Sequence, residues 1–169
     1  RITRFVEKPK DPALLDSLHL PREMYPSLDI ESNEELFLAS MVYDGVMERF
    51  PQLRFGITEL GATWLASFMH FIDTGHRSFR NIQDLSHLSM KPSDYLRRQV
   101  VVSPFAGEDV GWVIEQSGTD MVAFSSDFPH HEGTDDPIKR FEASMTDIDE
   151  RTRNEFYDGN GRWLLGSRL

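Results

Sequence analysis

Asp127 follows the apolar run 121–125, whose composition is typical of a buried strand. A carboxylate is costly to bury unless it is paired or coordinated, so an aspartate in this position indicates a bound ligand. There it could coordinate a divalent metal ion or accept a proton from metal-bound water. His130, His131 and Glu132 lie within five residues of it, so several ligating side chains share one strand end. The alternative is that Asp127 caps a turn and both histidines are solvated.

Two other apolar segments end in residues of interest. The segment 53–58 is followed by Glu59, and the β-branched segment 99–103 ends at Ser103 before a proline. In folds with parallel strands, the active residues lie at the carboxyl ends of the strands. Of the three strand ends, the one at Asp127 has the most side chains that could bind a metal ion or transfer a proton.

Helical patterns separate these three strands. Ser32 and Glu35 match a capping box before an amphipathic helix over residues 34–49. A second helix is predicted over residues 62–73, then a polar loop over 74–91. Further helices are predicted from Pro92, over 108–116, from Pro137 to about residue 145, and over 146–157. A turn at 158–161 precedes the closing segment 162–165.

This alternation predicts an α/β fold with parallel strands and crossover helices. Three strands make a thin sheet, because parallel sheets need both faces covered. The 169 residues are also too few for a whole (β/α)8 barrel, which takes about 250. We therefore expect the C-terminal half of a TIM barrel over residues 32–169, preceded by an irregular, proline-containing loop region over 1–31.

Composition narrows the function classes. With 18 basic and 28 acidic residues, the net charge of −10 argues against nucleic-acid binding through phosphate contacts. The absence of cysteine excludes disulfides, thiolate zinc sites and a cysteine nucleophile. No apolar run is long enough for a membrane span and no signal peptide pattern is present, so we expect a cytoplasmic protein acting on a small molecule.

Three segments resemble the amidohydrolase-related family, which includes aminocarboxymuconate-semialdehyde decarboxylase and the resorcylate decarboxylases. The segment Phe124-Ser125-Ser126-Asp127-Phe128-Pro129-His130, followed by Glu132-Gly133, looks like the family's last-strand motif. Residues 50–55 and 59–65 are similar to its sixth-strand region, and residues 160–166 to its C-terminal helix. The resemblance implies a TIM barrel of which this chain supplies the C-terminal half.

The resemblance also implies roles for three residues. Asp127 matches the eighth-strand aspartate, a metal ligand and acid/base catalyst, and His130 points toward the substrate. Glu59 stands where many members have a histidine metal ligand, and is expected to contact metal or substrate through oxygen, or to leave the site with weak metal binding or none. The family's first-strand histidine pair and fifth-strand histidine have no counterpart here.

The sequence thus predicts part of a metal-dependent enzyme that hydrolyses a C–N or C–O bond or decarboxylates a small carboxylic acid. Zinc is the expected metal if histidines complete the site, and manganese if oxygen ligands dominate. The alternative is a non-catalytic half-barrel that serves in protein interaction. Because a half-barrel exposes strand edges, we expect pairing with a second copy or with the missing barrel half.

Overall fold

The computed structural model describes residues 33–130 and 134–166, which divide into two compact units. The first unit contains residues 33–51 and 70–96, and the second contains the other described residues. Helices α4 (Trp64–Phe79) and α5 (Pro92–Gln99) each contribute to both units. The predicted loop region 1–31 lies outside the described residues, as does Ser32 of the predicted capping box.

The first unit begins with two helices where one was predicted. Helix α2 (Asn33–Tyr43) ends before Gly45, and α3 (Val46–Arg49) follows it. Gly45 has a φ of 69°, a left-handed conformation that glycine adopts without steric cost. Its amide donates to the Val42 carbonyl (2.9 Å), which closes α2. The prediction of a single helix over 34–49 was therefore wrong.

Polar contacts in the first unit fix the helix ends. Asp73 accepts hydrogen bonds from the Ser93 amide (2.9 Å) and hydroxyl (2.8 Å) at the start of α5, which begins at Pro92 as predicted. Helix α4 continues to Phe79, six residues beyond the predicted end. The polar groups of residues 74–79 lie on the exposed surface of the helix, where Arg77 donates to Thr74 (2.9 Å). The prediction that the polar loop begins at residue 74 was therefore wrong.

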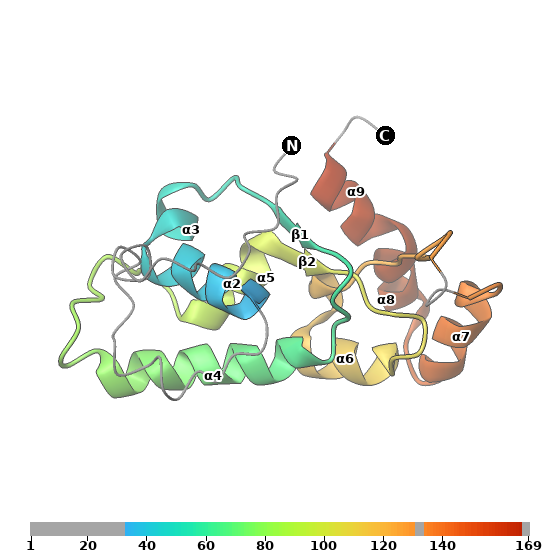
Figure 1. The fold of residues 1–169 in the computed structure, drawn as a ribbon, viewed down its shortest axis with the longest axis horizontal. Helices are drawn as coiled ribbons and strands as arrows, with labels where there is room; N and C mark the ends of the chain where they lie inside the picture. Colours follow the sequence, from blue (N-terminus) through green and yellow to red (C-terminus); the bar gives the residue numbers. More distant parts are fainter. Residues whose placement is uncertain (1–32, 131–133, 167–169) are drawn as a thin grey trace. The chain divides into compact units, whose positions relative to one another are not determined.

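The second unit is built on parallel strands. Strand β1 (Phe55–Ile57) pairs with β2 (Val100–Val102) in the register Phe55↔Val100 to Ile57↔Val102 (Figure 1). All three β2 residues are buried, as expected for a parallel strand covered on both faces. The segment that continues β1 at its carboxyl end is 58–61, and the one that continues β2 is 103–105.

The third predicted strand, 121–125, forms one bridge only. Val122 pairs with Val102 in parallel, and a 3₁₀-helix, η2 (Thr119–Met121), precedes it. The ladder stops because the Phe124 amide donates to the Phe156 carbonyl (2.9 Å) instead of to a strand. Phe124 joins Phe141 and Phe156 in an aromatic cluster with ring centroids 5.2–6.2 Å apart. The expected three-stranded sheet is thus two strands and a bridge.

Three helices in the second unit begin directly after an aspartate. Side chains of Asp109, Asp136 and Asp149 accept the capping bond of helices α6 (Val110–Ser117), α7 (Pro137–Ser144) and α8 (Glu150–Asn154). A π-helical turn, η3 (Glu155–Gly159), and α9 (Asn160–Leu165) continue from α8 without interruption. The predicted turn at 158–161 was wrong, because Gly159 and Gly161 stay helical.

The described architecture is α/β, with parallel strands connected through helices, as the sequence predicted. That this is the C-terminal half of an eight-stranded barrel stays a prediction. Among the helices of the described ranges, none combines the length and the apolar character needed to cross a bilayer.

Candidate functional site

Two regions of the second unit have chemical interest, and they lie at opposite ends of its parallel strands. Glu59 follows β1, and Asp127 follows the bridge at Val122, so both come after the carboxyl ends. Arg97 and Asp120 come before β2 and the Val122 bridge, at the amino ends. We call the first region the carboxyl-end cluster (Glu59, Asp127 and His130) and the second the amino-end pocket.

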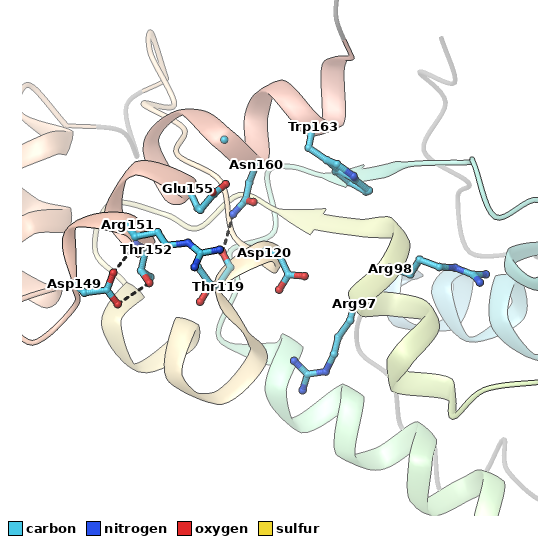
Figure 2. Close-up of a pocket in the computed structure, with 11 residues that line it drawn as sticks. Arg97, Arg98, Thr119, Asp120, Asp149, Arg151, Thr152, Glu155, Asn160 and Trp163 are labelled. Atoms are coloured by element: carbon cyan, nitrogen blue, oxygen red, sulfur yellow. Dashed lines mark hydrogen bonds between the residues drawn. The ribbon is translucent and has the colours of Figure 1, made fainter.

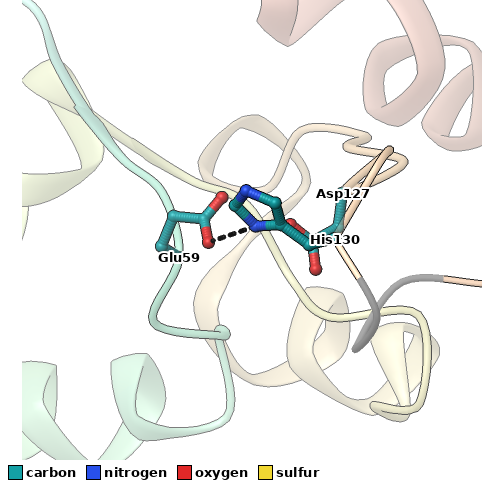
Figure 3. Close-up of side chains that lie close together, drawn as sticks. All are labelled: Glu59, Asp127 and His130. Atoms are coloured by element: carbon teal, nitrogen blue, oxygen red, sulfur yellow. Dashed lines mark ion pairs between the residues drawn. The ribbon is translucent and has the colours of Figure 1, made fainter.

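The structure brings Glu59, Asp127 and His130 together. One potential ligand atom from each lies within 4.8 Å of the others. The His130 Nδ1 atom is 3.3 Å from Glu59 Oε2 and 3.3 Å from Asp127 Oδ1, and Figure 3 shows the ring facing the Glu59 carboxylate. The Asp127 side chain is only 10% exposed, against 44% for Glu59 and 53% for His130. The cluster therefore has one member with a largely covered side chain, Asp127, and two that face solvent.

Asp127 has an oxygen without a partner. Its Oδ2 atom is buried and has no hydrogen-bond donor among the residues that the structure describes. Leaving a buried acceptor unsatisfied costs about 1–3 kcal/mol, and more when the group is charged. A cation bound at this oxygen would remove that cost, so the donor set fits a metal ion.

The backbone at both carboxylates is left-handed. Glu59 has a φ of 69° and Asp127 a φ of 55°. For residues with a side chain this conformation costs about 1–2 kcal/mol, and it persists only where surrounding contacts impose it. At Asp127 the chain closes a turn in which the His130 amide donates to the Asp127 carbonyl (2.8 Å), and this turn brings the imidazole back toward the carboxylate.

The sequence also indicated other residues at the same strand ends. The Ser103 amide donates to the Ile57 carbonyl (2.8 Å) and so extends the ladder beyond β2. His131 and Glu132, predicted as further candidates, lie outside the described residues. Sequence reasoning took Glu108 only as the first residue of a helix, although its carboxylate contacts both loops beside the cluster.

The ligand atoms available at the carboxyl-end cluster are two carboxylates and one imidazole nitrogen. Carboxylate oxygens are preferred by hard ions such as Mg²⁺ and Mn²⁺, and imidazole suits zinc and other transition metals. A bound divalent ion would supply Lewis acidity and lower the pKa of a bound water. Three protein groups with open positions are typical of catalytic sites, whereas structural zinc sites are closed by four.

The amino-end pocket has a volume of about 710 Å³ (Figure 2). Its charged lining comprises three arginines and three acids: Arg97, Arg98, Arg151, Asp120, Asp149 and Glu155. Many of its polar groups have partners within the protein. Arg97 donates to the Ser117 carbonyl, and buried Asn160 donates to the carbonyls of Thr119 (2.7 Å) and Val122 (2.8 Å). Because its charges balance and its polar groups bond within the protein, we assign this pocket to the stability of the fold and not to ligand binding.

No family model matches the chain, and no curated protein matches it. Solved structures do. An amidohydrolase from Mycobacterium avium subsp. paratuberculosis K-10 aligns with a TM-score of 0.67 and 25% identity, over 78% of this chain and 33% of that protein. The chain is related to the amidohydrolases. The resemblance read from the sequence is thereby confirmed at the level of the family.

Two more distant matches share the fold of this amidohydrolase-related chain. The 5-carboxyvanillate decarboxylase of Sphingomonas paucimobilis has a TM-score of 0.59 and 21% identity, over 75% of this chain and 37% of that protein. A dihydroxybenzoic acid decarboxylase from Polaromonas sp. JS666 was solved with manganese and the inhibitor 2-nitroresorcinol. It has a TM-score of 0.61 and 20% identity, over 94% of this chain and 46% of that protein. The chain spans about a third to a half of the length of these three structures.

Proposed function

We propose that the chain supplies the metal-binding carboxyl-end cluster of an amidohydrolase-related enzyme that acts on a small molecule. The observation that carries this proposal is the convergence of Glu59, Asp127 and His130, with ligand atoms within 4.8 Å of one another at the carboxyl ends of parallel strands. The buried Oδ2 of Asp127, which has no partner in residues 33–130 and 134–166, supports a cation there rather than a simple turn cap.

We assign Asp127 two functions, as a metal ligand and as the group that accepts or returns a proton during the reaction. Its low exposure of 10% limits competition from bulk water. With a cation bound at Oδ2, its second oxygen, Oδ1, is the one available to carry a proton. His130 and Glu59, both partly exposed, face the substrate side of the cluster. His130 Nδ1 lies 3.3 Å from an oxygen of each carboxylate, so it adds a nitrogen to the same set of ligand atoms.

Manganese is the metal that we propose first. Two of the three protein groups offer oxygen, which favours manganese over zinc in this part of the site. The Polaromonas decarboxylase contains manganese, which supports the same choice. The reaction is either hydrolysis of a C–N or C–O bond or decarboxylation of a small carboxylic acid. We propose that this half-barrel completes its pocket with a further barrel segment, on this polypeptide or a partner.

Calorimetric titration of the full chain with Mn²⁺ tests the metal site. The matched pair of variants is Asp127→Asn and Asp147→Asn, which make the same chemical change inside and outside the cluster. Because loss of supporting groups alone weakens metal sites 10- to 100-fold, loss of a ligand should weaken binding by at least about 100-fold. Asp147→Asn should bind as the wild type does. No saturable binding by the wild type, or equal binding by both variants, would overturn the proposal.

A further inference from the structure

We propose that Glu108 is a positioning residue for the metal site. Its carboxylate fixes the loop 59–63 so that Glu59 reaches Asp127 and His130. This inference rests on the metal binding proposed above and adds a residue from outside the cluster. Glu108 precedes helix α6 and touches none of the three ligand candidates through any contact described, so its effect on the site is indirect.

One carboxylate joins two loops. Glu108 Oε1 accepts from the amides of Ala62 (2.9 Å) and Thr63 (2.9 Å), in the loop after β1. Its Oε2 accepts from the Phe105 amide (2.7 Å), in the loop after β2, and also lies 3.0 Å from the Ala62 amide. Hydrogen bonds to a carboxylate are stronger than those between neutral groups. Glu108 therefore joins the loops that follow β1 and β2, and the first of these loops contains Glu59.

The loop that Glu108 holds is strained at the metal-ligand position. Between β1 and α4, both Glu59 (φ 69°) and Gly61 (φ 65°) are left-handed. A side chain at Gly61 would place its Cβ 2.9 Å from Glu108 Oε1, so glycine allows the close approach of the carboxylate. On the other side, Trp64 Nε1 donates to the Gly61 carbonyl (3.0 Å). These contacts impose the conformation that Glu59 would not adopt unaided.

A simple helix cap does not account for all of these contacts. The amides of Ala62 and Thr63 precede α4, and a carboxylate there favours the helix. The Phe105 amide belongs to a different loop and contributes nothing to that helix. A capping function predicts lower stability alone, whereas a positioning function predicts weaker metal binding and altered ligand geometry in the folded protein.

Cobalt titration of the full chain separates these two functions. Bound Co²⁺ has a visible spectrum that reports ligand number and geometry, and its titration gives the affinity. We expect Glu108→Ala to weaken Co²⁺ binding about 10- to 100-fold and to change the spectrum, because positioning groups affect metal sites on this scale. Glu108→Gln keeps one acceptor oxygen and should recover part of the affinity. Glu115→Gln, on the exposed side of α6, is the matched control and should bind as the wild type does.

Gly61→Ala disturbs the same contact from the opposite side. It should weaken Co²⁺ binding, and its combination with Glu108→Gln should weaken binding by less than the product of the single effects, since both act on one contact. This pair tests the inference even if Glu108→Ala does not fold. Wild-type affinity and spectrum in folded Glu108→Ala, or in both Glu108→Gln and Gly61→Ala, would overturn the inference alone. A wild type that binds neither Mn²⁺ nor Co²⁺ would overturn the metal site as well.

Discussion

The two ends of the parallel strands differ in how well their polar groups are satisfied by contacts within the protein. The amino-end pocket is lined by three arginines and three acids, and buried Asn160 donates hydrogen bonds to two carbonyls. At the carboxyl-end cluster, two carboxylates face one imidazole, and two residues have a left-handed backbone. One carboxylate oxygen there has no hydrogen-bond partner within the described parts of the chain. The amino-end pocket therefore stabilises the fold. The carboxyl-end cluster lowers the stability of the metal-free fold, and a bound ligand would restore part of it. Residues at the two ends should respond differently to substitution.

The largest effect is expected at the amino-end pocket. Asn160→Ala leaves the carbonyls of Thr119 and Val122 without their donor, and should lower the free energy of unfolding by about 3 kcal/mol. Urea denaturation measures this change. Asn154→Ala, an exposed position in α8, is the matched control and should change stability far less. Equal losses of stability in the two variants would contradict the structural function assigned to Asn160.

The next effect belongs to the carboxyl-end cluster and depends on metal. Free Mn²⁺ at 100 times its dissociation constant should raise the free energy of unfolding by about 2.7 kcal/mol, because the ion binds only the folded chain. Thermal denaturation with and without Mn²⁺ measures the shift. Asp127→Asn should lose it, whereas Asp149→Ala, which lines the amino-end pocket, should keep it. A shift retained by Asp127→Asn would place the ion elsewhere.

A smaller effect has the opposite sign. Glu59→Gly should raise the free energy of unfolding of the metal-free protein by up to about 1 kcal/mol, because glycine tolerates the φ of 69°. The same variant should lose metal affinity. Glu59→Ala removes the carboxylate but keeps the unfavourable backbone, so it should not show this gain. Denaturant unfolding of both variants without metal makes the comparison, and a gain in Glu59→Ala would assign the effect to charge instead.

The smallest effect concerns the exposed cap of α8. Hydrogen bonds from the Thr152 amide (2.9 Å) and hydroxyl (3.0 Å) hold the pKa of Asp149 below its usual value of 3.8. A lowered pKa in the folded state means that ionised Asp149 stabilises the fold above pH 3.8 and that this stabilisation is lost as pH falls below it. Asp149→Ala should therefore be less stable than the wild type at pH 7, and the difference should shrink as pH falls below 3.8. A difference that persists unchanged in acid would refute the assignment.

Local patterns predicted much of the fold. Proline at position 92, and Asp136 before Pro137, mark the starts of α5 and α7, because capping chemistry is local. Tertiary contacts decided the remainder. Residues 121–125 have strand composition, yet the Phe124 amide turns to Phe156, 32 positions later, and the strand is not formed. The break at Gly45 depended on a backbone conformation that hydrophobic spacing does not report.

The candidate site was predictable in part for the same reason. Parallel strands bring their carboxyl ends to one edge, so Glu59 and Asp127 were expected there from the alternation of elements alone. The functions assigned to them, and to His130, stay predictions. Glu108 could not be identified from its own neighbourhood, because its partners Ala62 and Thr63 are 46 and 45 positions away. A carboxylate that accepts backbone amides leaves no spacing pattern.

The wide π-helical turn η3 makes the C-terminal segment sensitive to chain length. Thr152, Phe156 and Asn160 are all buried, four residues apart, and the wider turn keeps this four-residue period on one side of the continuous helix. A regular α-helix advances about 100° per residue. Deleting one residue from η3 would therefore rotate Asn160 by about that angle, away from both carbonyls that it serves. In this stretch, a change of length would be more harmful than most changes of residue type.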